Sequence, residues 1–251
     1  MNEYMKNLNR LEFVVTWACT GKCRHCSEGD HLSCGEKIDA EAAAQVVRRA
    51  AEQYAIQSVM TFGGEPLLCP EAVFRIHSAA AEMNIPRRQL ITNGFFTRDE
   101  SAIRTAAHRL LESGVNDILL SADSFHQETI PIEPVKRFAE AVLKENIPLR
   151  MSPAWLVSPE ADNPWNRKTH KVLSQFTAMG IPVGSGNVIF PAGNALRYLG
   201  EYFDADHLPE NPYVDDPFDV RCVSVCPDGS ALGGNIYESD ILALIGAYSP
   251  R

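Results

Sequence analysis

The sequence predicts an α/β fold in which strands and helices alternate as a partial (β/α)6 barrel with a small C-terminal extension. Short apolar, β-branched runs alternate with helical patterns about every thirty residues, the length of one βα unit. Such connections imply parallel strands with right-handed crossovers. A closed barrel needs eight units and typically about 250 residues, whereas this alternation ends near residue 190. We expect a core at 1–190 and an extension at 191–251.

In the first half of the chain, strands are expected at 11–17, 58–62 and 89–92. A helix over 38–54 is alanine-rich and has Asp39 as its N-cap. A second helix begins at Pro70, which suits the first helical position. Thr97 and Glu100 resemble a capping box for a third helix, which Gly114 would terminate.

The second half continues the pattern and then loses it. Strands are expected at 117–122, 149–157 and 181–190, and helices at 134–146 and 166–179. Beyond residue 190 the chain has an acidic, proline-containing stretch at 201–219 and a last helix starting near Ser239. This change of pattern is the reason for separating 191–251 from the core.

The composition restricts the class of protein. The formal net charge of −9 argues against broad binding to nucleic acid or to anionic membranes, which needs a basic face. No apolar run is long enough to span a membrane, and the first residues lack the apolar segment of a signal peptide. We therefore expect a cytoplasmic protein, in which the seven cysteines serve as ligands, core residues or catalytic thiols rather than disulfides.

Three cysteines directly follow the first strand. Cys19, Cys23 and Cys26 are separated by three and then two residues. Thiolates select zinc or iron–sulfur clusters, and a cubane cluster of four irons usually takes four cysteines. Three cysteines in one loop would leave one iron exposed, as a catalytic zinc site keeps one coordination position open.

The pattern Cys19-x3-Cys23-x2-Cys26 resembles the signature of the radical S-adenosylmethionine (radical SAM) superfamily, in which the residue before the last cysteine is usually aromatic, here His25. The resemblance implies a partial barrel, a [4Fe-4S] cluster and S-adenosyl-L-methionine. It also implies that the methionine moiety chelates the open iron, and that the reduced cluster cleaves the sulfonium to a 5′-deoxyadenosyl radical. The alternatives are a structural zinc site, which usually has four ligands in paired spacings, and a ferredoxin-like electron carrier. The nearest extra cysteine, Cys34, is irregularly placed for zinc.

Further motifs lie where the predicted strands end, which is the edge at which ligands bind in such folds. Residues 63–66 resemble the family's GGEP motif, whose carbonyls and glutamate would accept hydrogen bonds from the methionine ammonium, and 92–94 resembles its TNG turn. Ser121 and Ser152 would contact ribose, and Val188 would contact adenine. Ordinary turns, and a core position for Val188, are the alternatives. The residues expected to bind the cofactor are His25, Gly63, Gly64, Glu65, Pro66, Asn93, Ser121, Ser152 and Val188.

Four further residues are candidates for a catalytic role. Asp123 and His126 follow the fourth strand and would touch substrate, although His126 could also be a surface histidine. Cys222 and Cys226 resemble a truncated SPASM or twitch extension. They would hold an auxiliary cluster together with Cys34 or Cys69, donate a hydrogen atom as a thiol, or simply pack in a vestigial domain.

These expectations lead to a radical SAM enzyme of oxidoreductase or isomerase type that abstracts a hydrogen atom, with a peptide or natural-product precursor as substrate. A glycyl-radical activase and a small-metabolite enzyme are the alternatives within the family. A non-catalytic iron–sulfur or zinc protein is the alternative from another class. The expected partners are a peptide or small-molecule substrate and a flavodoxin- or ferredoxin-like electron donor, with no nucleic acid and no membrane.

Overall fold

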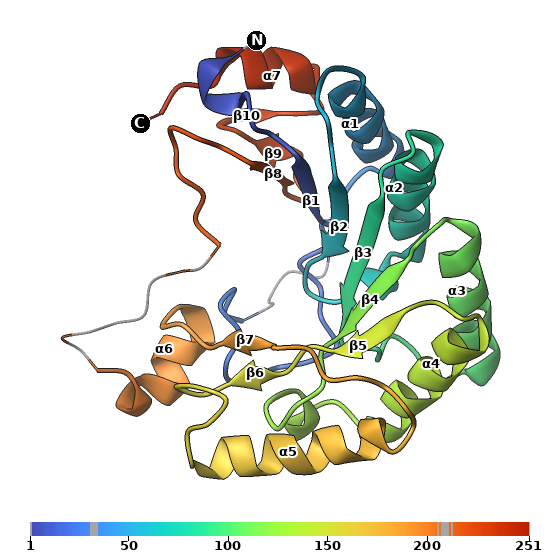
Figure 1. Cartoon of the computed structure of the whole chain (residues 1–251), viewed down its shortest axis with the longest axis vertical. Coiled ribbons are helices and arrows are strands. Elements are labelled where there is room, and N and C mark those ends of the chain that lie inside the picture. The colour runs from blue at the N-terminus through green and yellow to red at the C-terminus, as the bar shows by residue number, and fades with distance from the viewer. Residues whose placement is uncertain (1, 31–34, 205, 207–210, 212, 251) are drawn as a thin grey trace.

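A computed structural model describes residues 2–30, 35–204, 206, 211 and 213–250. Its centre is a six-stranded parallel sheet in the order β5-β4-β3-β2-β1-β8, which curves without closing (Figure 1). The sheet strands are β1 (Arg10–Val14), β2 (Ser58–Phe62), β3 (Arg87–Thr92), β4 (Asp117–Leu120), β5 (Leu149–Met151) and β8 (Cys222–Val225). The predicted α/β class and the incomplete barrel are confirmed.

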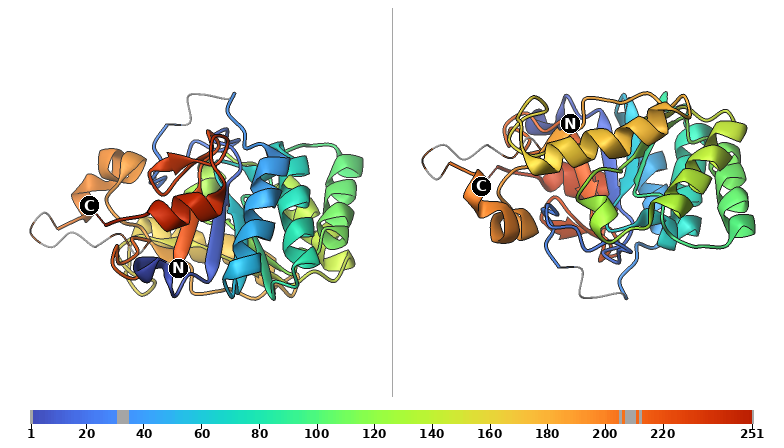
Figure 2. Two further views of the ribbon diagram at one scale, coloured as in Figure 1. Left: turned by 90° about the horizontal axis from the view of Figure 1, so that it is seen from above. Right: turned by 90° about the horizontal axis from the view of Figure 1, so that it is seen from below.

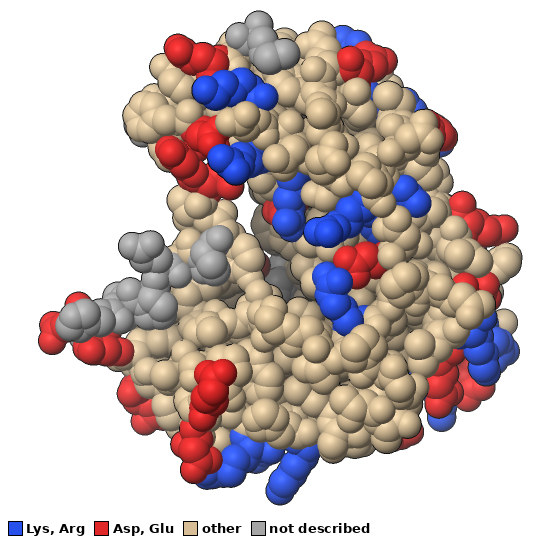
Figure 3. Space-filling view, viewed as in Figure 1, with Lys and Arg blue, Asp and Glu red and all other residues tan. Residues whose placement is uncertain are grey.

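Four helices cover the convex side of the sheet (Figure 1), and the space-filling view shows a hollow on its concave side (Figure 3). They are α1 (Ala40–Gln53), α2 (Pro70–Glu82), α3 (Glu100–Glu112) and α4 (Ile132–Lys144). The core lies between sheet and helices, where Phe13, Leu90 and Ile118 are fully buried. Asp39 caps α1 as expected, because its side chain accepts a hydrogen bond from Ala42 N–H.

The start of α3 differs from the prediction. Asp99, rather than Thr97, is the N-cap, and its side chain accepts from Ser101 N–H. The Thr97 hydroxyl instead accepts from Asp99 N–H at 3.2 Å. The helix therefore begins two residues later than the capping-box pattern suggested. Gly114, at φ +84°, follows its end as predicted.

The last two expected core strands are broken. The stretch 149–157 divides into β5 and β6 (Ala154–Trp155) around Pro153, whose missing N–H cannot donate to a ladder. The stretch 181–190 forms one isolated bridge between Val183 and Met151, and then β7 (Asn187–Val188). β6 and β7 pair with each other as a separate parallel ribbon, next to α5 (Pro164–Thr177) and α6 (Gly193–Leu199).

The sixth place in the main sheet is taken by β8, which comes from the predicted extension. β8 runs parallel to β1, with Leu11 opposite Val223 and Phe13 opposite Val225. Val223 and Val225 are buried in the same core as β1. The hairpin of β9 (Ser230–Ala231) and β10 (Gly234–Asn235) follows, and then α7 (Ile241–Ala247). The domain boundary at 190/191 stays a prediction, but the tail shares the central sheet.

Figure 2 shows α7 and α5 at opposite ends of the sheet, α7 beside β8 and α5 beyond β5. Within the described residues no helix is long and apolar enough to cross a membrane.

Candidate active site

The loop that carries the three cysteines is fixed to the ends of β1 and β2 by backbone hydrogen bonds. Gly64 N–H donates to Thr16 C=O and Glu65 N–H to Ala18 C=O, each at 2.8 Å. Cys23 is buried, while Cys19 and Cys26 are half-buried. The predicted position of this loop, at the carboxyl end of the first strand, is therefore observed.

Two glycines allow the loop after β2 to approach the cysteine loop this closely. A Cβ on Gly64 would lie 2.1 Å from Ala18 O, and one on Gly63 would lie 2.5 Å from Thr16 O. Gly63 also has φ +146°, which L side chains rarely adopt. Both glycines belong to the stretch that resembles the GGEP motif. The structure shows that they let the two loops approach each other.

Glu65 is fully buried between these loops and β3. Its Oε1 accepts from Leu67 N–H at 2.9 Å and from the Thr92 hydroxyl at 2.7 Å, and its Oε2 accepts from Asn93 N–H at 2.8 Å. Burial raises the pKa of Glu65 to about 7, although these hydrogen bonds oppose the rise. The carboxylate thus joins the ends of β2 and β3. Its predicted contact with the methionine ammonium stays a prediction.

Two asparagines lie against the cysteine loop. Asn93 Nδ2 lies 3.7 Å from Cys19 Sγ and donates to the Thr20 hydroxyl at 3.2 Å. Asn194, at the start of α6, donates from its backbone N–H to Cys26 C=O at 2.9 Å and from Nδ2 to Cys23 C=O at 3.3 Å. Sequence reasoning identified Asn93 and missed Asn194, because nothing in its local sequence signals a contact with residues so distant in the chain.

The geometry of the three thiols bears on which metal they would hold. Among the described residues, the one group of three or more His, Cys, Asp or Glu ligands within 4.8 Å of one another is His25, Asp123 and His126. The three thiols are close enough to one another that the charges of Cys19 and Cys26 contribute to the raised pKa of Cys23. Three neighbouring thiolates in one loop fit three irons of a cluster.

Burial disfavours the charged form of these thiols. It raises the pKa of Cys19 to about 11, against the opposing hydrogen bond from Gly21 N–H. Burial is also the largest cause of the raised pKa values of Cys23 and Cys26. Thiolates in such surroundings need a positive partner, which bound iron supplies.

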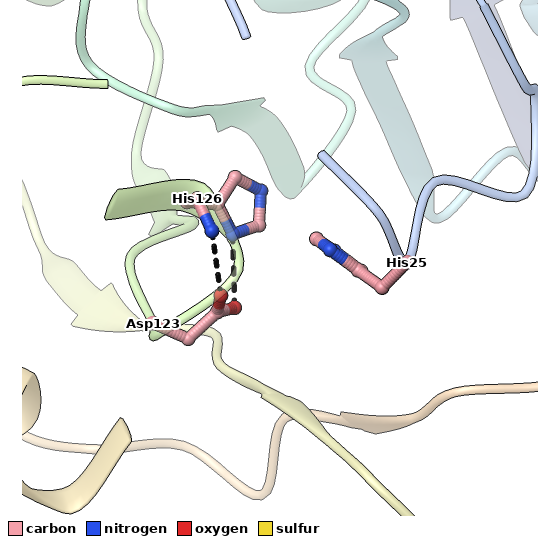
Figure 4. A group of neighbouring side chains, drawn as sticks. All are labelled: His25, Asp123 and His126. Atoms are coloured by element: carbon pink, nitrogen blue, oxygen red, sulfur yellow. Dashed lines mark hydrogen bonds and ion pairs between the residues drawn. The ribbon is translucent and has the colours of Figure 1, made fainter. Parts of the chain in front are cut away.

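Asp123 and His126, from the loop after β4, form a hydrogen-bonded pair next to His25 (Figure 4). His126 Nδ1 lies 2.9 Å from Asp123 Oδ2, and the His25 and His126 ring centroids are 4.7 Å apart. His25 also contacts Phe125, with ring centroids at 5.0 Å. Burial lowers the pKa of His25 to about 4, so its ring is neutral near pH 7. The aromatic position before Cys26 thus lies beside both predicted substrate-facing residues.

Asp123 is fully buried, and protein groups already occupy both of its oxygens. Oδ1 accepts from the backbone N–H groups of Phe125 and His126, and Oδ2 accepts from Ala154 N–H at 2.8 Å. Burial tends to raise the pKa of Asp123, but the neighbouring histidines and these hydrogen bonds hold it well below its usual range. An ionised Asp123 holds His126 in its orientation, and the predicted contact of Asp123 with substrate stays a prediction.

The other predicted cofactor contacts lie at the same edge of the fold. Ser121 and Ser152 follow β4 and β5, where Ser121 N–H donates to Thr92 C=O and Ser152 N–H to Leu120 C=O. Both serines are half-buried. Val188, on β7, is 40% exposed and is therefore not a core residue. Pro66 is buried at the first position of a 3-10 turn.

Cys222 and Cys226 lie at opposite ends of β8. Cys222 pairs with Arg10 at the start of β1, whereas Cys226 follows the last residue of β8, at the edge that carries the cysteine loop. Their Cα atoms are four steps of extended strand apart, about 13 Å, and the auxiliary cluster stays a prediction. Cys69 caps α2 and lines an outer cavity together with Lys37 and Tyr237. Cys34 lies outside the described residues.

Comparison with known families identifies the family of this chain. The family model described as "Radical SAM superfamily" matches residues 13–150, which run from β1 to β5. The chain belongs to the radical SAM superfamily. That family is defined by a [4Fe-4S] cluster and S-adenosyl-L-methionine, and the loop with Cys19, Cys23 and Cys26 is consistent with such a cluster.

Similar proteins include cyclases and structures with bound cofactor. A "Probable GTP 3′,8-cyclase" from Saccharolobus solfataricus is 26% identical over 222 residues, covering 81% of this chain and 67% of the relative. A "GTP 3′,8-cyclase" from Vibrio vulnificus is 32% identical over 127 residues, covering 47% of this chain and 36% of the relative. The chain thus spans only about a third to two thirds of these relatives' lengths.

Two solved structures share the fold of this radical SAM chain. The structure titled "Native anSMEcpe with bound AdoMet" has a TM-score of 0.60 at 16% identity, covering 95% of this chain and 80% of that one. Streptococcus suis SuiB bound to S-adenosylmethionine has a TM-score of 0.57 at 12% identity, and the match covers 95% of this chain and 66% of SuiB. At this identity the likeness supports the partial-barrel fold and nothing finer.

Proposed function

We propose that this radical SAM protein cleaves S-adenosyl-L-methionine reductively and abstracts a hydrogen atom from a polar substrate held in the hollow of the partial barrel. The observation that carries the proposal is the convergence of Cys19, Cys23 and Cys26 with the Asp123–His126 pair at the carboxyl edge of the sheet. Cys23 is close enough to Asp123 for that carboxylate to raise the pKa of the thiol, second only to burial.

When bound, the cluster and S-adenosyl-L-methionine supply a 5′-deoxyadenosyl radical that removes the hydrogen atom. Cys19, Cys23 and Cys26 would hold three of the four irons. Asn93 contacts the sulfur of Cys19 and Asn194 bonds to the backbone of Cys23, so both hold this loop in place. His25 would pack against the cofactor, while Ser121 and Ser152 would bind its ribose.

His126 would hold or move a proton on the substrate. Its Nδ1 is directed to Asp123, which fixes the ring orientation and makes Nδ1 the protonated nitrogen. Nε2 is then the nitrogen available to a ligand. His126 is therefore the proposed catalytic residue, and Asp123 is the residue that positions it.

Cys226 and Cys222 take different places in this proposal. Cys226 lies at the carboxyl edge, where a thiol could return a hydrogen atom to a substrate radical. Cys222 lies at the base of the hollow. A thiol that donates hydrogen would make the enzyme an isomerase or epimerase, because the abstracted hydrogen is replaced rather than lost. Exchange of one deuterium from solvent into the product, absent in Cys226→Ala, supports this role, and an unlabelled product removes it.

The substrate class has two candidates. A peptide or natural-product precursor is the expectation from the C-terminal cysteines. A small metabolite is the second candidate, because the curated relatives are named GTP 3′,8-cyclases. A flavodoxin- or ferredoxin-like protein is the proposed electron donor.

Anaerobic reconstitution with iron and sulfide tests the function. The reconstituted protein should be brown, should lose its colour in air, and should convert S-adenosyl-L-methionine to 5′-deoxyadenosine and methionine when dithionite is added. A colourless protein with bound zinc, or a coloured protein inert toward S-adenosyl-L-methionine, would overturn the proposal. Incubation with GTP, followed by mass spectrometry, separates the cyclase candidate from the peptide candidate.

A further inference from the structure

The concave wall of the sheet carries a row of mostly polar side chains that runs across neighbouring strands. Side chains alternate between the two faces of a strand, and on β1 Leu11 and Phe13 enter the core while Arg10 and Glu12 face the hollow. The register places Ser224, Glu12, Met60, Gln89 and Asp117 opposite one another on neighbouring strands. Figure 3 shows the resulting basic and acidic atoms along the wall of the hollow.

These side chains contact one another along the row. On the β8 side, the Ser224 hydroxyl donates to Glu12 Oε2 at 3.3 Å, and Glu12 Oε1 pairs with Arg10 at 2.5 Å. Arg10 also reaches Met60 Sδ at 3.3 Å. The acidic member therefore fixes the guanidinium of Arg10 in place over β2.

The β5 side repeats this arrangement. Arg150 NH1 donates to both oxygens of Asp117, at 2.8 and 3.1 Å, and Gln89 Nε2 donates to Asp117 Oδ2 at 2.7 Å. Arg87, two residues before Gln89, faces the same side of β3 and is opposite Ser58. Three arginines and the carboxylates of Glu12 and Asp117 thus lie along the wall, and the carboxylate of Asp215 lies beside Cys222 at its β8 end.

Several donors in this row lack a protein partner. Arg10 Nε is buried and bonds to no group of the described chain, and its bond to a thioether sulfur is weak. Arg87 makes no ion pair with any described residue, and Arg150 uses only NH1. A guanidinium presents five donors in a planar fork that matches carboxylate and phosphate oxygens.

We propose that Arg10 and Arg87, which lie on either side of Ser58 at the starts of β1 and β3, form an oxyanion site at the base of the hollow, which binds a carboxylate or phosphate group of the substrate. The inference rests on the proposed function. It adds that the substrate is anionic at the end remote from the reacting carbon.

The depth of the site sets the length of the substrate. Arg10 begins β1, and the cysteine loop follows the end of that strand, about 13 Å away at 3.3 Å per residue. A substrate anchored by the arginines and reacting near the cysteine loop must therefore extend over about 10 Å, the size of a nucleotide or a short peptide.

Binding measurements on the reconstituted holoenzyme test this site. Isothermal titration calorimetry with glutarate, inorganic phosphate and GTP covers both oxyanion classes. We expect at least one probe to bind the wild type, and Arg10→Gln/Arg87→Ala to weaken that binding about tenfold or more, because the double variant loses two guanidinium donors. Arg104→Ala, on the outer face of α3, is the matched control and should bind as the wild type does.

Each outcome decides the proposal. Binding of glutarate alone assigns a carboxylate substrate, and binding of phosphate or GTP assigns a phosphate-bearing one. Absence of binding by all three probes, or equal binding by the double variant, overturns the oxyanion site. Circular dichroism of the double variant shows whether it is folded. Dithionite-driven cleavage of S-adenosyl-L-methionine by the wild type is a separate measurement, so failure of the proposed function is distinguished from failure of this site.

Discussion

His126 Nδ1 lies 2.9 Å from Asp123 Oδ2, and Asp123 in turn accepts hydrogen bonds from three backbone N–H groups, those of Phe125, His126 and Ala154. Every partner of this carboxylate is a donor. The side chain therefore has to be an ionised acceptor to satisfy the site, which explains the lowered pKa of Asp123 despite its full burial.

Asp123→Asn should disturb this pair without changing its shape. The amide NH2 would face an N–H donor, which leaves buried donors unsatisfied and lowers the free energy of unfolding by about 1–3 kcal/mol. The ratio of modified substrate to 5′-deoxyadenosine should fall about tenfold or more, because His126 loses its fixed orientation. Asp99→Asn, at the exposed cap of α3, is the control for stability. An unchanged product ratio in Asp123→Asn would contradict the positioning role.

Cys23→Ala should abolish both iron loading and the cleavage of S-adenosyl-L-methionine. Cys23 is the most buried of the three cysteines, and the cluster depends on all three thiolates. Absorbance in the visible range and the yield of 5′-deoxyadenosine measure the two effects, and circular dichroism should show a retained fold. Cys69→Ala, at the cap of α2, is the matched control. Cleavage that survived in Cys23→Ala would show that the cofactor site lies elsewhere.

Iron analysis should give about four iron atoms per chain, the content of one cubane cluster. The reason is that Cys222 and Cys226 lie at opposite ends of β8 rather than side by side. The double variant Cys222→Ala/Cys226→Ala should therefore load the same amount of iron as the wild type. About eight iron atoms in the wild type, reduced to four in the double variant, would contradict this expectation.

Gly64→Ala should prevent correct formation of the cysteine loop. Its Cβ would lie 2.1 Å from Ala18 O, which is backbone and cannot swing aside. We expect loss of most cluster loading together with a lower free energy of unfolding. Gly246→Ala, where a Cβ has no neighbour within 4 Å, is the matched control and should load iron normally. Equal iron content in the two variants would show that the close approach of the loops is dispensable.

Glu65 should make the stability of the apoprotein depend on pH. Burial raises its folded pKa from 4.5 to about 7, so the native state binds the proton more tightly than the unfolded state does. The stabilisation from this group is fully present below about pH 4.5 and is lost as the pH rises toward 7, in total about 3 kcal/mol. Denaturant unfolding between pH 4.5 and 8 measures it. Glu65→Gln should remove this pH dependence from the free energy of unfolding. An identical pH profile for the wild type and the variant would show that Glu65 is not its source.

The sequence alone predicted which motifs lie at the carboxyl edge of the sheet. The spacing of Cys19, Cys23 and Cys26 and the Gly63–Gly64 pair are local patterns, and each follows a strand whose apolar run is readable without the fold. Because parallel strands end at one edge, placing these motifs after strands was enough to bring them together. The Asp39 cap and the helices between the strands were also predictable from local sequence patterns. The break at Pro153 was not predicted, because the hydrophobic pattern suggested one continuous strand.

Only the tertiary structure decided which strand closes the sheet and what faces the hollow. β8 pairs with β1 although more than 200 residues separate Leu11 from Val223, and no local pattern specifies a pairing between such distant segments. That pairing separates Cys222 from Cys226 and places Ser224 against Glu12. The alternation of Arg10 and Glu12 with Leu11 and Phe13 was visible in the sequence. The alternation alone did not show which residues Arg10 and Glu12 contact, because the register decides which side chains of neighbouring strands meet.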